Sequence, residues 1–343
     1  MRKIVFALAG ISILFFSSCK KDKDETTPTA SDRSKADDAA ARNEFNRIYD
    51  IAEDVFNSSE YDNSTTNRVA YVLPCGNVTL NAQNFTIDYS NSTTCGSRVL
   101  SGTVAVELQA GHTKFSEQGA VLKFTFTDYK VLYTNSNQSL VYNGTAYVTN
   151  TSGGKLLDLF TGATTIEHKV RADLDVLFDS TGSGSANVTR VWHVFRNKVF
   201  ESTGAGTGIS LTLNGDTSST DNSYINGTYN NISEYGLNRE GKKFINNVTQ
   251  AFVWENCGTT VSGPYILKTG EVTHTAYLGN FIPVLYPDAY ATFTAKAGAL
   301  GTAGTPSGVI VNNCTSNGYN ISWTIRNGVS GSPTTIGSAF LPY

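Results

Sequence analysis

From Arg68 onward, apolar residues alternate with polar residues along most of the chain. A period of two residues is typical of β-strands, because successive side chains of a strand point to opposite faces of its sheet. Such segments recur between Asn84 and Ile325, and clusters of Gly, Asn and Ser separate them as hairpin loops require. No long helical pattern lies between them. This excludes parallel βαβ units and predicts antiparallel pairing.

One segment ahead of this region has the helical period instead. Residues 35–57 carry apolar side chains at spacings of three and four, which places them on one face of a helix. They are Ala41, Phe45, Ile48, Tyr49, Ala52, Val55 and Phe56. Because such a stripe must be buried, we expect the helix to pack on a sheet; a helix that docks on a partner protein is the alternative.

The two patterns together predict an all-β protein. We expect a large antiparallel β-sandwich or an open, barrel-like sheet over residues 68–343, with one N-terminal helix packed on it. Sandwiches and barrels of this size are often single domains, so the spacing leaves one large domain or two small ones open. The hydrophobic content of 40% is enough for a substantial core.

The first residues of the chain form an export signal. Arg2 and Lys3 give a basic start, and an apolar run from Ile4 to Phe16 is too short to span a bilayer but suits a signal peptide. Small residues then lead to Cys19, which is the acceptor position of bacterial lipoproteins. We therefore predict a lipoprotein signal peptide at 1–18, cleavage before Cys19, and a membrane anchor of fatty acids such as palmitate on Cys19.

Residues 19–34 are expected to be a disordered tether, because their charges are balanced and they lack apolar periodicity. The Lys and acidic cluster at 20–25 resembles the surface-export signal of Bacteroidota-type lipoproteins. We therefore expect an outer-membrane lipoprotein that faces the cell exterior, with a periplasm-facing location as the alternative.

Four cysteines remain once Cys19 is assigned to lipid: Cys75, Cys95, Cys257 and Cys314. An even number in an oxidising compartment favours disulfides. The sequential pairing, Cys75–Cys95 and Cys257–Cys314, closes the shorter loops and would contribute roughly 3 to 4 kcal/mol for each bond. The other pairings and free buried thiols stay open. A metal site is disfavoured, because no two of these cysteines lie within a few residues of each other.

Charged residues make up only 16% of the chain, well below the roughly 25% of ordinary soluble proteins. The formal net charge is −3, and removal of Arg2 and Lys3 with the signal peptide takes it to −5. An acidic surface argues against nucleic acid and against electrostatic docking on anionic lipid. The predicted partner is the membrane, reached through the lipid on Cys19, while a glycan or protein ligand remains open and no cofactor is indicated.

Three features occur together: the lipoprotein start, a helix that reads Phe45-Asn46-Arg47-Ile48-Tyr49-Asp50, and four later cysteines near strands that begin at Ser101-Gly102 and Ser262-Gly263. In this combination the chain resembles a family of lipoproteins of unknown function from Bacteroidota-type bacteria. The chain departs from that family's pattern in carrying Gly96-Ser97-Arg98 after the second cysteine. The resemblance implies an extracytoplasmic location and a β-rich fold, and it implies no catalytic residues.

Residue types that carry chemistry are present but not in recognised patterns. None of the four histidines has metal-ligand spacing. His193 shares its strand face with Val191 and Phe195, so we expect a structural histidine on the core face. Asp173 and Asp175 would lie roughly 7 Å apart, as paired glycosidase carboxylates can, but their alternation with apolar residues favours a solvated face.

Two further groups of residues have a functional alternative. Asn214, Asp216 and Asp221 could hold calcium, although a plain hairpin loop is favoured. Trp192, Trp254 and Trp323 could offer sugar-stacking platforms, although the last two stand close to a cysteine and suit the core. We therefore predict no catalytic residue and no metal ligand. The function expected is non-enzymatic binding or structural support in the cell envelope, with a glycan-binding lipoprotein as the alternative and a hydrolase as the least favoured.

Overall fold

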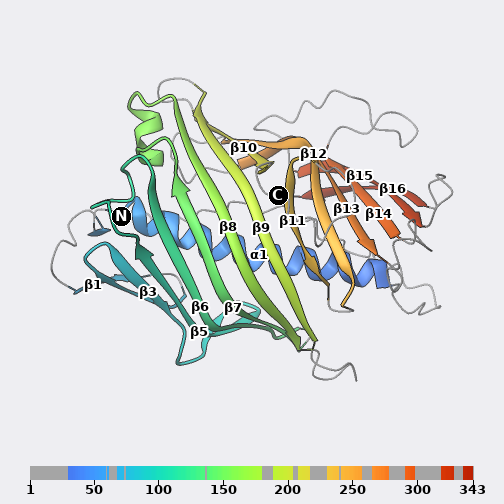
Figure 1. Cartoon of the computed structure of the whole chain (residues 1–343), viewed down its shortest axis with the longest axis horizontal. Coiled ribbons are helices and arrows are strands. Elements are labelled where there is room, and N and C mark those ends of the chain that lie inside the picture. Colours follow the sequence, from blue (N-terminus) through green and yellow to red (C-terminus); the bar gives the residue numbers. More distant parts are fainter. Residues whose placement is uncertain are drawn as a thin grey trace.

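Figure 1 shows the chain as a computed structural model. The structure describes residues 30–58, 60–61, 68–72, 75–135, 137–179, 188–203, 208–216, 230–238, 241–256, 265–277, 290–297, 318–327 and 335–342. The predicted signal peptide with Cys19, and also Cys257 and Cys314, lie outside the described residues. For part of these residues, including everything after Thr275, the structure describes the backbone alone.

The described strands form one antiparallel sheet of 16 strands, which confirms the predicted all-β class with a packed helix. The strands join into a single sheet rather than two stacked ones. Their bounds are β1 Arg68–Val72, β2 Asn77–Asn81, β3 Asn84–Asp88, β4 Thr93–Cys95, β5 Arg98–Leu108, β6 Ala120–Tyr133, β7 Gln138–Asn150, β8 Thr165–Asp179, β9 Val188–Ser202, β10 Ile209–Gly215, β11 Ile232–Leu237, β12 Lys243–Asn256, β13 Tyr265–Tyr277, β14 Tyr290–Ala297, β15 Gly318–Asn327 and β16 Thr335–Pro342.

Consecutive strands pair with one another across most of the sheet, with two exceptions. The short strand β4 pairs only with β5. Strands β10 and β11 share one position between β9 and β12. β10 pairs with the C-terminal half of β9 and β11 pairs with residues 191–194 of its N-terminal half. Two short strands placed end to end therefore fill this one position in the sheet.

A close backbone approach marks the place where β10 ends and β11 begins. A Cβ atom on Gly215 would collide with the backbone of Asn231 and Ile232, so only glycine fits there. The register between β11 and β12 also shifts between Ile232 and Glu234, which is a β-bulge. Bulges re-aim side chains, and this one lies beside the charged groups described below.

One helix, α1, runs from Ala30 to Phe56 and crosses the strands on one face of the sheet (Figure 1). It begins at Ala30 rather than at residue 35, so the last residues of the predicted tether are helical. All seven residues of the predicted apolar stripe are buried in the main core. The core therefore lies between α1 and the sheet face that it covers, which we call the inner face.

Strand β8 shows how alternation places side chains on this inner face. His168, Val170, Ala172, Leu174 and Val176 are buried, and the residues between them are half-buried or exposed. A 3-10 helix, Leu156–Phe160, connects β7 to β8.

Among the described residues, no helix has the length and apolar character needed to cross a membrane.

Cys75 and Cys95 form a disulfide, with Cα atoms 5.8 Å apart. This confirms the first of the two predicted pairs, while the pair of Cys257 and Cys314 lies outside the described residues. The bond links the segment that precedes β2 to the end of β4. It therefore closes a loop around the hairpin of β2 and β3.

Candidate functional site

The buried face of α1 is not wholly apolar. Glu44, Asp50 and Glu53 are buried, and Arg42 and Asn46 are half-buried beside them. Burying an ionised carboxylate is costly unless a cation or hydrogen-bond donors compensate it. The sheet must therefore offer positive charge beneath this helix.

Strand β9 supplies that charge. On its inner face Arg190, Arg196 and Lys198 lie among apolar residues and are almost fully buried. This pattern is hard to recognise in the sequence, because the run Arg196-Asn197-Lys198 breaks the apolar alternation after Phe195. The polar run instead continues the strand to Ser202, with its two cations turned toward α1.

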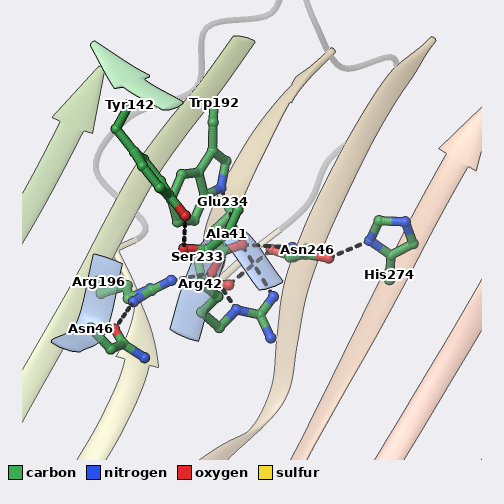
Figure 2. A network of polar contacts seen from close by, with 10 residues as sticks. All are labelled: Ala41, Arg42, Asn46, Tyr142, Trp192, Arg196, Ser233, Glu234, Asn246 and His274. Carbon is green, nitrogen blue, oxygen red and sulfur yellow. Dashed lines mark hydrogen bonds and ion pairs between the residues drawn. The ribbon is translucent and has the colours of Figure 1, made fainter. Parts of the chain in front are cut away.

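Glu234 on β11 is the centre of a charged network between α1 and the sheet (Figure 2). Arg42 Nε donates to Oε1 of Glu234 at 2.8 Å, and Arg42 Nη2 donates to Oε2 at 3.1 Å. Arg196 Nη2 also donates to Oε1. The other terminal nitrogen of Arg196, Nη1, donates to Asn46 Oδ1 on α1 at 2.7 Å. Two arginines from different elements thus clamp one carboxylate whose residue is only 1% exposed.

The network continues across the strands through residues that are directly opposite one another. Asn246 on β12 pairs in register with Glu234 and donates from Nδ2 to Oε2 at 2.9 Å. His274 on β13 pairs in register with Asn246, and its Nδ1 lies 2.7 Å from Asn246 Oδ1. Trp192 Nε1 adds a longer contact of 3.3 Å to Oε2. Figure 2 shows this row of side chains running away from α1 across β11, β12 and β13.

These contacts keep Glu234 ionised. Burial alone would raise the pKa of its carboxyl group, but the charges and hydrogen bonds of Arg42 and Arg196 more than offset this and hold the pKa well below its usual range. Glu234 therefore acts as the fixed anion that fastens α1 to the sheet.

Lys198 and Asp50 lie next to this network but have few partners. Lys198 is 5% exposed, and its Nζ lies 3.4 Å from the centre of the Tyr49 ring, a cation–π contact. No hydrogen-bond acceptor of the described residues contacts that nitrogen. Asp50 is 7% exposed, and its Oδ1 has no hydrogen-bond partner in the described part of the chain. A buried carboxyl oxygen without a partner is rare in native proteins and calls for an explanation.

Burial shifts the pKa values of Asp50 and Lys198 so that the neutral form of each group is favoured. Burial raises the pKa of Asp50 well above its ordinary value, and Glu53 and Asp54 add to this while Lys198 opposes it. Burial also lowers the pKa of Lys198 to about 8 against the attraction of Asp50. Desolvation therefore outweighs the mutual attraction of the two groups.

Toward the C-terminal end of α1, the polar stripe meets His168 on β8. Tyr49 Oη lies 2.8 Å from His168 Nδ1, and Glu53 Oε1 lies 3.0 Å from the same nitrogen. Burial raises the pKa of Glu53, but the charge and hydrogen bond of His168 outweigh it and leave the pKa below its ordinary value. His168 Nε2 is buried and has no described partner, and the side chain borders a second cavity of about 320 Å³.

A larger cavity opens between the middle of α1 and strands β9 to β13. It contains about 560 Å³ of space between atoms, part of which is open to solvent. One wall is polar and consists of Arg42, Asn46, Asp50, Arg196, Lys198, Ser233 and Glu234. The apolar wall consists of Leu211, Leu213, Val248, Phe252, Trp254 and Val272. We call this space the α1 cavity.

The apolar wall results from strand pairing. Leu211 and Leu213 on β10 lie directly opposite Trp254 and Phe252 on β12. The rings of Phe252 and Trp254 stack with centroids 5.8 Å apart. A mostly apolar lining with a few convergent polar groups is typical of ligand sites. The α1 cavity has this character.

Most residues singled out in the sequence lie elsewhere. Asp173 and Asp175 are exposed on the outer face of β8, which confirms the solvated interpretation. His193 contradicts its prediction, because Trp192 and Val194 face the core while His193 lies on the outer face with Val191. There it contacts Asp173 Oδ1 at 2.6 Å and stacks on Tyr235. Apolar residues cover both faces of β9 at this point, so alternation could not tell the two faces apart.

Of the described residues considered for calcium binding and sugar stacking, Trp254 alone lines the α1 cavity. Asp216 forms an ion pair with Arg171 beyond the end of β10, Asn214 belongs to β10, and Asp221 lies outside the described residues. Trp192 and Trp254 are buried, as a core role requires, and the side chain of Trp323 is not described. Within the described ranges, no group of three or more His, Cys, Asp and Glu residues could hold a metal ion.

Comparison of the chain with protein-family models, with curated proteins and with solved structures finds no match. The site geometry and the sequence therefore carry the functional argument.

Proposed function

We propose that this chain is a lipid-anchored protein of the outer membrane surface whose role is to bind a small ligand, without chemical conversion, in the α1 cavity. The observation that carries the proposal is the pair Asp50 and Lys198. Both line one cavity and are buried; Asp50 Oδ1 has no hydrogen-bond partner among the described residues, and Lys198 Nζ lies over the Tyr49 ring. Polar groups buried at this cost are explained if a ligand or its water completes their hydrogen bonds.

The walls support binding rather than a purely structural role. A buried ion pair contributes little net stability compared with apolar residues of similar size. The Glu234 network nevertheless holds the polar side of the cavity rigidly, with donors contributed by α1, β9 and β12. Residues fixed by their neighbours in this way provide a preorganised site.

Anchoring is the part of the proposal that rests on Cys19. Replacement Cys19→Ala removes the sulfur that accepts the lipid, so we expect the protein to move from the membrane fraction to the soluble fraction. Protease added to intact cells should degrade the wild-type protein if it faces the exterior. Unchanged fractionation of the variant would refute the anchor, and protection from protease would refute the surface location.

Binding in the cavity is tested by narrowing it. Leu213→Trp places a larger side chain in the apolar wall, and Leu157→Trp makes the same change at an exposed position of the 3-10 helix. Each protein is isolated from cell envelopes, and its co-purified small molecules are identified by native mass spectrometry. We expect a ligand that is retained by wild type and Leu157→Trp but reduced at least tenfold in Leu213→Trp. Identical small-molecule profiles in all three would contradict the proposal.

A hydrolase is the second candidate function, because of His168 alone. The Glu53 carboxylate and the Tyr49 hydroxyl both contact Nδ1 of His168. Nε2 could therefore accept a proton from a water molecule in the second cavity, which the His168 side chain borders. His168→Gln would abolish hydrolysis of p-nitrophenyl acetate if this site were catalytic. Equal rates for wild type and His168→Gln would dismiss the candidate.

A further inference from the structure

We propose that the ligand of the α1 cavity is an amphiphile with one carboxylate head and a single unbranched apolar chain, that is, a medium-chain fatty acid. This inference rests on the proposed binding function and specifies its ligand. It follows from the separation of the cavity into a charged wall and an apolar wall.

Charge on the polar wall selects an anionic head. Arg42, Arg196 and Lys198 contribute three positive charges and Glu234 contributes one negative charge, whereas burial raises the pKa of Asp50 and favours its neutral form. Glu234 is already saturated by the two arginines, so Lys198 is the cation left to bind a ligand. A monoanionic head would place a counterion beside the buried charge of Lys198.

Lys198 and Asp50 can together bind one carboxylate head. A carboxylate oxygen can accept a hydrogen bond from Lys198 Nζ, which has donors to spare. The other oxygen can share a proton with Asp50, whose Oδ1 has no partner in the described residues. An uncharged alcohol would satisfy one of these groups but would leave the lysine charge without a counterion.

Across the cavity, the apolar wall suits a single chain. Leu211, Leu213, Phe252 and Trp254 form a continuous surface over β10 and β12, and Val272 extends it onto β13. No charged side chain interrupts this wall. An apolar chain directed away from Lys198 would therefore stay in contact with apolar atoms along its length, as a single unbranched chain can.

The test uses the full lipidated protein in phosphatidylcholine nanodiscs, with binding to empty nanodiscs subtracted. The probes are radiolabelled decanoate, decanol and decyl phosphate, which share a chain and differ in the head. We expect decanoate to bind at least tenfold more tightly than decanol and more tightly than decyl phosphate. Shortening decanoate to octanoate should weaken binding about fourfold for each methylene removed.

Variants assign these effects to the two walls. Lys198→Met should reduce decanoate affinity to that of decanol while leaving decanol binding unchanged, which also shows that the cavity is still folded. Trp254→Ala should weaken decanoate and decanol alike. Lys169→Met, which changes a lysine on the outer face of neighbouring β8, is the matched control and should bind as wild type does.

The outcomes separate the inference from the proposed function. Equal affinity for decanoate and decanol, or tighter binding of decyl phosphate, would overturn the carboxylate assignment. Failure of all three probes, with a co-purified ligand that still depends on Leu213, would overturn the fatty-acid class and leave the binding function standing. Failure of the probes together with identical small-molecule profiles would overturn both.

Discussion

Glu234 joins the charged residues of α1 to those of the sheet. Its carboxylate forms ion pairs with Arg42 and Arg196, and removing it would take this counterion away from both arginines. Removing one partner of a buried charge network typically costs about 3 to 5 kcal/mol. We therefore expect Glu234→Ala to lower the free energy of unfolding by about this amount, measured by urea denaturation.

The matched control for this change is Glu201→Ala, at an exposed position near the end of β9. An exposed substitution should change the free energy of unfolding by no more than about 0.5 kcal/mol. If Glu234→Ala were as stable as Glu201→Ala, the network would not fasten α1 to the sheet.

Asp54 on α1 predicts a pH dependence of stability. Burial, aided by the negative charge of Glu53, raises the pKa of Asp54 to about 7, against roughly 3.9 in the unfolded chain. Between these values the folded protein binds more protons than the unfolded one, so the stability that protonation contributes is full below about pH 4 and is lost as the pH rises toward 7. Glu234, whose pKa is lowered, acts in the opposite direction only below about pH 4.3.

We expect the free energy of unfolding of the wild-type protein to decrease between pH 4.5 and 7. Asp54→Asn should reduce this decrease of stability with pH. The part of the decrease that remains is due to Asp50, whose pKa is also raised. Asp175→Asn, at an exposed position on β8, should leave the slope unchanged. A wild-type stability that increases over this pH range would contradict the assignment.

Sequence reasoning found the apolar residues of the interface and missed the charged ones. The stripe from Ala41 to Phe56 follows from helical spacing, because burial of apolar side chains leaves a period in the sequence. Charged residues are normally read as solvent-exposed, so Asp50 and Lys198 gave no such signal. The available clue was in β9, where Arg196 and Lys198 share the face of Trp192 and Val194 at intervals of two.

At the scale of elements, α1 is held mainly by its apolar residues. The ring of Phe45 packs edge-on against Trp192 with centroids 5.6 Å apart and also contacts Phe126. Replacing a buried phenylalanine with alanine typically costs about 3 to 5 kcal/mol. We expect Phe45→Ala to destabilise the protein by about this amount and to accelerate amide hydrogen exchange throughout α1.

Arg47→Ala, on the exposed side of the same helix, provides the comparison. Its side chain makes only a 3.6 Å ion pair with Glu44, so exchange in α1 should stay close to that of wild type. Equal exchange in the two variants would show that Phe45 does not anchor the helix.

The Cys75–Cys95 disulfide fixes the edge of the sheet near β2 to β4. It closes a loop of sequence separation 20, which in the loop-entropy account contributes roughly 3 kcal/mol. We expect the double variant Cys75→Ser with Cys95→Ser to lose about this much stability in urea denaturation under non-reducing conditions. A variant as stable as wild type would show that the bond adds nothing to the folded state.

The class and pairing of the strands were predictable, but the arrangement of β10 and β11 was not. Alternation marks a strand and its two faces, and it does not specify which half of β9 each short strand joins. That choice depends on the close approach at Gly215 and on the bulge before Glu234, which are tertiary features. The α1 cavity lies at this irregular position, so its existence could not be read from periodicity.

At the scale of the whole molecule, the interface between the sheet and α1 has an apolar part and a charged part. The sheet face under α1 from β3 to β8 is filled by the apolar core, whereas at β9 to β13 the helix meets charged residues and a cavity. If the chain is anchored through Cys19, the tether leads directly into the helix that covers this cavity. The molecule as a whole then presents a binding site fixed close to a membrane surface.

The most direct test of this account is a crystal structure of the protein with 10-bromodecanoate, in which anomalous scattering locates the bromine atom. The account predicts one bromine in the α1 cavity, beside Trp254 and Val272, with the carboxylate at Lys198. Bromine found only outside the cavity, or an α1 cavity that stays without the ligand at saturating concentration, would contradict it.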